Sequence, residues 1–181
     1  MRVSLLNGNP SAGEFDHYLD RLQEGLRKPG IELNTFCLRE MNIRYCNGCF
    51  GCWVKTPGEC VNRDESAVVN RAVINSDLTI LASPIIMGFY SAVLKRTVDK
   101  FVPMVHPYIV IEQGEFHHKA RYAHYPSLAL ILGRTPGSDD EDINIINRIT
   151  RRTALNFKSG LAFTCMDDQP LEEVLNEINH I

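Results

Sequence analysis

Short apolar runs alternate along the chain with stretches in which apolar residues recur at helical spacing. The strand-like segments are residues 2–6, 31–36, 77–82, 128–132 and 160–164. The helix-like segments are residues 15–26, 64–73, 91–101, 139–157 and 170–178. This βα alternation predicts an α/β domain of three layers, with helices on both faces of a parallel sheet. Because crossovers are right-handed, the natural strand order is 2-1-3-4-5, and we expect one domain over 1–181.

Two local expectations refine this outline. Ser83-Pro84 should end the third strand, and Met87–Tyr90 should be a loop. In the long helix, we expect an apolar stripe to face inward, formed by Ile143, Ile146, Ile149 and Leu155.

One long segment, 102–126, shows no clear period and contains three prolines and four of the six histidines. An insertion of this length is usually functional or part of an interface. We therefore expect an irregular loop that forms an oligomer contact. Its histidines could bind metal, but no carboxylate pattern accompanies them, so a solvated or interface loop is the better interpretation.

The strand order places a ligand crevice over the carboxyl ends of the first and third strands. The loops there are Asn7–Asp16 and Ser83–Tyr90, and Gly133–Ser138 should join them. The second loop could support a flat aromatic ligand, with Gly88 allowing close approach and Met87 and Phe89 packing on its face. The alternative is that these apolar side chains are core or dimer contacts.

The first loop is ambiguous by its own chemistry. A small loop that opens a helix can present N–H groups to a phosphate, but this one is neither a dinucleotide fingerprint nor a P-loop. Glu14 and Asp16 at the helix start suit the helix dipole, yet they would repel a phosphate. A plain turn fits equally well.

Composition narrows the function classes. The 181 residues carry a net charge of -3, which argues against nucleic acid or an anionic membrane as the main partner. No apolar run approaches the 18 or so residues that a membrane span needs. The first residues do not resemble a signal peptide, so we expect a cytoplasmic protein with reduced thiols.

Four of the six cysteines form one compact run, Cys46-x2-Cys49-x2-Cys52-x7-Cys60. Four thiolates can hold a [4Fe–4S] cluster or a structural zinc. The run could instead contain buried free thiols, or a redox pair such as Cys49 and Cys52. By the chemistry of the four thiols alone, a metal site is the favoured interpretation of this run.

In these motifs, the chain resembles the flavodoxin-like NAD(P)H-dependent FMN reductases, near the iron–sulfur flavoproteins. The resemblance runs from Arg2 to about Phe163 and is most specific in IRYCNGCFGCWVKTPGEC (43–60) and SDLTILASPIIMGFYSAVLKRTVDKF (76–101). It implies a flavodoxin-like fold with FMN as cofactor and NAD(P)H as co-substrate. The cofactor-binding residues it implies are Asn9, Pro10, Ser11, Asp16, Ser83, Pro84, Ile85, Ile86, Met87, Gly88, Phe89, Gly133, Arg134 and Thr135.

The chain departs from the family pattern at two places. Phe15-Asp16 stand where the family has a small hydroxyl pair, and the last cysteine spacing is longer than usual. Members of this fold often pair as dimers, so we expect a homodimer or higher oligomer through 102–126.

The leading hypothesis is an FMN-dependent NAD(P)H oxidoreductase of the flavin- or quinone-reductase type. A second is an iron–sulfur electron carrier with a [4Fe–4S] cluster on Cys46, Cys49, Cys52 and Cys60. A third is a non-enzymatic flavodoxin-like binding module with a degenerate phosphate loop, suggested by Asp16.

Overall fold

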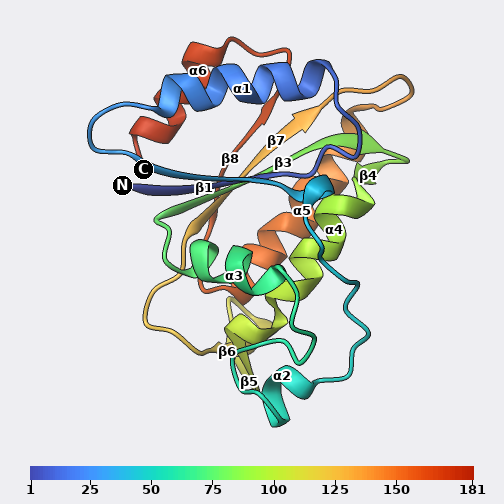
Figure 1. Cartoon of the computed structure of the whole chain (residues 1–181), viewed down its shortest axis with the longest axis vertical. Coiled ribbons are helices and arrows are strands. Elements are labelled where there is room, and N and C mark those ends of the chain that lie inside the picture. The colour runs from blue at the N-terminus through green and yellow to red at the C-terminus, as the bar shows by residue number, and fades with distance from the viewer.

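The computed structural model describes residues 1–181, and its centre is a parallel sheet with helices on both faces (Figure 1). The parallel strands run in the order β2-β1-β3-β7-β8. Their bounds are β1 (Arg2–Asn7), β2 (Glu32–Cys37), β3 (Leu78–Ile86), β7 (Ser127–Gly133) and β8 (Leu161–Met166). These are the first to fifth parallel strands along the chain, so the predicted 2-1-3-4-5 order is confirmed.

Helices close both faces of the sheet. α1 (Glu14–Leu26) and α6 (Leu171–Asn179) cover one face (Figure 1). α3 (Ser66–Ile74), α4 (Ala92–Val98) and α5 (Asp140–Asn156) cover the other. The sheet separates two apolar cores, because successive strand residues point to opposite faces: Leu5 packs under α1, and Leu6 packs toward α4. No helix is long and apolar enough to cross a bilayer.

The third strand is longer than expected. Ser83-Pro84 do not end β3; Pro84 pairs with Gly133, and the strand continues to Ile86. Residues expected as loop then turn back as β4 (Phe89–Tyr90), which pairs antiparallel with β3. Met87 and Gly88 form the turn with φ of 51° and 75°. Positive φ at both positions is the geometry of a type I′ hairpin turn.

The expectation of an irregular loop over 102–126 is wrong. The segment enters through a 3-10 helix (Asp99–Met104) and forms a hairpin of β5 (Val105–Glu112) and β6 (Glu115–Ala120). Its turn, Gln113-Gly114, also has positive φ at both positions. The Gln-Gly pair between β-prone runs was a signal for this hairpin. The hairpin lies beside α2 (Gly51–Val54) in a lower lobe away from α1 and α6 (Figure 1).

Helix α5 also differs in which side faces the core. Ile149 is 43% exposed, although it was expected inward. Thr150 and Ala154 are buried instead, below Ile146 at a spacing of four residues. The Thr150 hydroxyl donates to the Ile146 carbonyl over 2.9 Å, which satisfies its polar group inside the core.

Candidate functional site

The first loop after β1 is packed against its surroundings. The Gly8 N–H donates to the Ala82 carbonyl over 2.8 Å. A Cβ on Gly8 would lie 2.5 Å from the Leu94 Cβ, so only glycine lets the loop approach α4 this closely. The Ser91 hydroxyl donates to the Gly8 carbonyl. The loop is therefore held by β3 on one side and by α4 on the other.

The carboxylate of Asp16 occupies the centre of this loop. It accepts hydrogen bonds from Asn7 Nδ2 at 2.6 Å, from Asn9 Nδ2 at 2.8 Å and from the Gly13 backbone N–H at 3.1 Å. Arg39 Nη1, from the 3-10 turn after β2, donates a fourth at 2.8 Å. The side chain of Asp16 is 14% exposed. Both side-chain amides, a backbone N–H and a guanidinium thus converge on an anion that belongs to the chain itself.

This network keeps Asp16 ionised. Burial raises the pKa of the carboxyl, but the hydrogen bonds from Arg39 and Asn7 outweigh it, so the pKa lies below its usual value of 3.8. The same contacts hold the pKa of Arg39 above its usual value. Sequence reasoning recognised Asp16 but missed Arg39, because nothing in the spacing brings residue 39 to residue 16.

The β3–β4 turn carries the most exposed apolar side chain of the crevice edge. Met87 is fully exposed at a positive φ, where Asn or Gly would be favoured, and Ile86 before it is 39% exposed. A Cβ on Gly88 would lie 2.8 Å from Asp142 Oδ1, so the turn closely approaches the start of α5. Gly88 does allow close approach, but the group approached here is a carboxylate.

The third loop begins with Gly133, which lies under an aromatic ring. A Cβ on Gly133 would lie 2.6 Å from Phe15 Cδ2, so Phe15 packs directly on this backbone. Arg134 N–H donates to Asp167 Oδ1 over 3.2 Å, and its guanidinium lies 3.3 Å from Asp140. The Thr135 hydroxyl donates to the Ile85 carbonyl, which ties this loop to β3.

The fold therefore brings all three predicted loops to one edge, although not every predicted side chain faces outward. Ser83 and Ile85 are buried, and the Ser83 hydroxyl is engaged with the Pro84 carbonyl and the Ser91 N–H. Pro10 and Ser11 are exposed. Asp142, in the first turn of α5, and Asp167, directly after β8, adjoin the edge and were missed.

The cysteine run forms a second, separate feature. Its four thiols line one small cavity of about 60 Å³, together with Lys100. Cys46 and Cys49 are exposed, whereas Cys52 and Cys60 are half-buried. Even so, no three His, Cys, Asp or Glu side chains are close enough together to hold a metal ion.

A buried ion pair adjoins this thiol cavity. Lys100 Nζ lies 3.2 Å from Asp64 Oδ2, and both side chains are 1% exposed. The same ammonium donates to Cys60 Sγ over 3.4 Å. Burial lowers the pKa of Lys100, but its contacts with Asp64 and Cys60 outweigh this and raise it above 10.5.

Trp53 pins the cysteine segment to the β5–β6 hairpin. Its indole N–H lies 3.1 Å from the Val102 carbonyl and 2.9 Å from the Val105 carbonyl. Its ring packs against His118 with centroids 4.9 Å apart. Trp53 thus joins two segments of the lower lobe.

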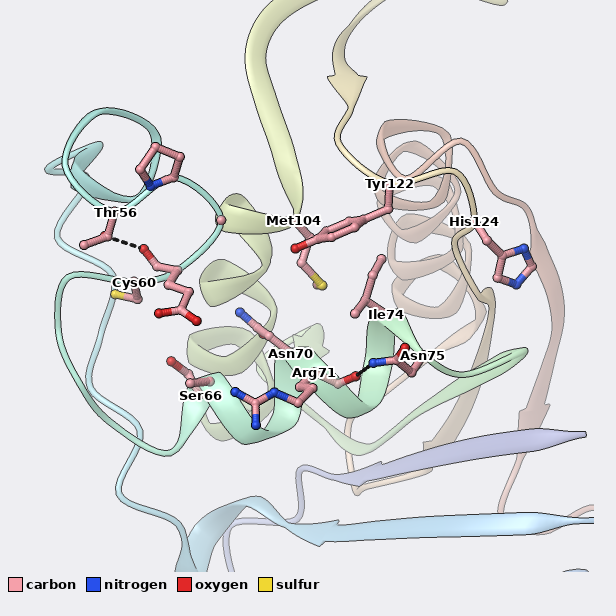
Figure 2. Close-up of a pocket in the computed structure, with 14 residues that line it drawn as sticks. Thr56, Cys60, Ser66, Asn70, Arg71, Ile74, Asn75, Met104, Tyr122 and His124 are labelled. Atoms are coloured by element: carbon pink, nitrogen blue, oxygen red, sulfur yellow. Dashed lines mark hydrogen bonds between the residues drawn. The ribbon is translucent and has the colours of Figure 1, made fainter.

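A cavity of about 750 Å³ lies beside α3, and sequence reasoning did not anticipate it (Figure 2). Ser66, Asn70 and Arg71 of α3 line it, opposite Met104 and Tyr122 (Figure 2). Thr56–Cys60 closes one side of it. Asn70 Nδ2 donates to the Lys100 carbonyl, while the Asn70 Oδ1 is buried without a partner.

A doubly wound sheet of order 2-1-3-4-5 with loops gathered at its carboxyl edge defines a flavodoxin-like protein. The sequence matches the family model of NADPH-dependent FMN reductases over residues 1–125, and the chain belongs to that family. It is 34% identical over 104 residues to an iron–sulfur flavoprotein of Archaeoglobus fulgidus, covering 58% of this chain and 46% of that protein. The chain thus spans about half the length of the curated relatives it matches.

Solved structures share the fold at low identity. An azoreductase from Bacillus anthracis has a TM-score of 0.65 at 11% identity, covering 98% of this chain and 92% of that one. An FMN-dependent NADH-azoreductase from the same species, solved in complex with FMN, has a TM-score of 0.58 at 12% identity. That alignment covers 99% of this chain and 95% of the azoreductase.

The loops at the carboxyl edge of the sheet fit a flavin mononucleotide unequally. The exposed turn at Ile86–Gly88 offers apolar surface for an isoalloxazine ring. The first loop does not fit the phosphate, because Asp16 already occupies the donors that would receive it. Four cysteines around one cavity are the right donor set for an iron–sulfur cluster, but their thiols would have to move closer together.

Proposed function

We propose that the chain is a flavin-dependent oxidoreductase that takes electrons from NADH or NADPH and delivers them to a flavin- or quinone-type acceptor. One observation carries the proposal: a fully exposed methionine at a positive φ forms the tip of the turn after β3, at the topological switch point of an FMN reductase fold. Ile86 beside it is 39% exposed, and two adjacent exposed apolar side chains at a ligand-binding edge offer a surface on which an aromatic ring can pack.

The chain's own part is to hold the flavin, which supplies the hydride chemistry when bound. Ile86, Met87 and Gly88 would support one face of the ring. Gly133, Arg134 and Thr135 would border it from the next strand, because β7 pairs with β3. We assign no side chain as acid or base.

The test compares two equivalent turns. Met87→Asn keeps the type I′ geometry and removes the apolar contact, whereas Gln113→Asn places the same residue at the equivalent position of the β5–β6 turn and removes no apolar side chain. We expect both variants to fold, and only Met87→Asn to weaken flavin binding and slow flavin-dependent NAD(P)H oxidation at 340 nm. If the wild type neither binds flavin nor oxidises either nucleotide, the proposed function is wrong. Equal effects of the two variants would remove Met87 from the site.

A second candidate is electron transfer through an iron–sulfur cluster. It is supported by four thiols around one cavity and by the likeness to proteins named iron–sulfur flavoproteins. Cys46, Cys49, Cys52 and Cys60 would be the ligands, and none of them is engaged in a disulfide. Anaerobic purification with iron and sulfide analysis tests it, with Cys165→Ser as the control. Absence of iron under those conditions eliminates the cluster.

We also propose that the β5–β6 hairpin is a contact between copies of the chain. The hairpin exposes Ile109, Ile111 and Phe116 at 58%, 71% and 79%. Adjacent exposed apolar side chains on a hairpin are typical of an interface. Phe116→Ser should shift the sedimentation coefficient toward that of a monomer. A wild type that already sediments as a monomer contradicts this proposal.

A further inference from the structure

We infer that Asp16 is an internal substitute for the flavin phosphate, so that the chain recognises a flavin by its ring and gains no affinity from a 5′-phosphate. This inference rests on the proposed flavin site and concerns which part of the ligand that site recognises. FMN and riboflavin should then be interchangeable ligands.

The first argument is the geometry of the donors. In a doubly wound fold, the loop after the first strand and the start of the following helix form the natural anion site. Here the anion in that place is the Asp16 carboxylate, which accepts from Asn7, Asn9, Gly13 and Arg39. A phosphate could receive these hydrogen bonds only by displacing a carboxylate that satisfies them already.

The second argument is the limited room left by the remaining loop groups. The Asn9 N–H donates to Asn7 Oδ1 over 2.9 Å, and the Gly8 N–H is bound to β3. Phe15 closes the neighbouring space by packing on Gly133. The backbone N–H groups of Gly8 and Asn9 are thus engaged within the protein and are not available to bind a phosphate.

The third argument is the charge of the crevice edge. Acidic side chains gather at the starts of α1 and α5 and after β8; they are Glu14, Asp16, Asp139, Asp140, Glu141, Asp142, Asp167 and Asp168. The two arginines of this edge are already paired, Arg39 with Asp16 and Arg134 with Asp140. A dianionic phosphate would therefore meet a negative field with no free cation to offset it.

The test is a titration of flavin fluorescence with FMN and with riboflavin. For the wild type we expect dissociation constants within about threefold of each other. Asp16→Ser frees the donors and opens the space, so FMN should bind about 10- to 100-fold more tightly while riboflavin is unchanged, the range of one charge-assisted hydrogen bond. Asp20→Asn is the matched control: it removes a charge from the same helix, but the Asp20 carboxylate accepts its hydrogen bond from Gln23 and not from the loop donors, so both ligands should bind as to the wild type.

Two results would overturn the inference. One is a wild type that binds FMN more than about tenfold more tightly than riboflavin, a measurement that needs no variant to fold. The other is an Asp16→Ser variant that folds and gains no preference for FMN.

A flavin-independent arm separates this inference from the proposed function. In a titration with inorganic phosphate followed by ¹⁵N chemical shifts, Asp16→Ser should show saturable shifts at Gly13 and Arg39, and the wild type should show none. If these shifts appear but no flavin binds, the flavin function fails and the assignment of Asp16 stands. Saturable shifts in the wild type would refute the assignment.

Discussion

The buried ion pair beneath the cysteine segment offers a direct test of the packing of the lower lobe. Lys100→Met removes an ammonium that is 1% exposed and leaves the carboxylate of Asp64 buried without its cation. Removing one partner of a buried pair typically costs about 3–5 kcal/mol. Asp64 retains the backbone N–H of Arg44 and that of Ser66, each at 3.0 Å, and the Ser66 hydroxyl. We therefore expect Lys100→Met to lower the free energy of unfolding by an amount at the lower end of this range, about 3 kcal/mol at pH 7.

The pH dependence of this loss has a definite sign. Burial raises the pKa of Asp64, but its hydrogen bonds from Ser66 and Arg44 and its contact with Lys100 outweigh this and lower it below 3.8. The pair therefore contributes fully above that value, and its contribution is lost as the pH falls through the lower, folded-state pKa. On the alkaline side, the raised pKa of Lys100 keeps the contribution until the pH exceeds 10.5.

Urea unfolding at pH 7 and near pH 3 measures both effects. Lys95→Met is the matched control, because Lys95 pairs with Asp99 on the surface with about half of each side chain exposed. That variant should cost less than about 0.5 kcal/mol. A Lys100→Met cost near that of the control, or one that does not shrink at low pH, would refute the reasoning.

Three further predictions follow from single contacts. Gly133→Ala should destabilise the fold by about 1–3 kcal/mol, because the new methyl would collide with Phe15; an unchanged melting temperature would contradict this packing. In acid unfolding, Asp16→Asn should lose less stability than the wild type as the pH falls below 3.8. The pKa of Asp16 is lowered in the folded state, so the stabilising contribution of its carboxylate is lost in that range; a pH profile identical to wild type would argue against the network. Trp53→Phe should lower the free energy of unfolding by about 1–2 kcal/mol and speed amide hydrogen exchange in β5–β6, because the carbonyls of Val102 and Val105 lose their donor. Faster exchange in β1 and not in β5–β6 would contradict this role of Trp53.

Much of the framework could be predicted because it depends on local pattern. Phe15, Leu19 and Leu22 recur at helical spacing, and they form the buried face of α1. The apolar runs around Leu81 and Leu130 became neighbouring buried strands, since right-handed crossovers leave few alternatives. The errors lay where pattern is weak: Ser83-Pro84 resembled a strand end, and the β5–β6 hairpin was hidden among prolines and histidines.

The features of the candidate site also divide into those that local sequence predicts and those that it does not. Sequence alone determined the sheet order, because βα alternation with right-handed crossovers leaves few topologies. It also determined the three loops that meet at the carboxyl edge and the compact run of thiols, because each consists of residues close together in the chain. Only the tertiary structure decided that Arg39 reaches Asp16, that Phe15 covers Gly133 and that Lys100 lies beside Cys60. These contacts join residues far apart in the chain or on separate elements, and the free energy that selects them comes from burying charge and volume together, which no local spacing encodes.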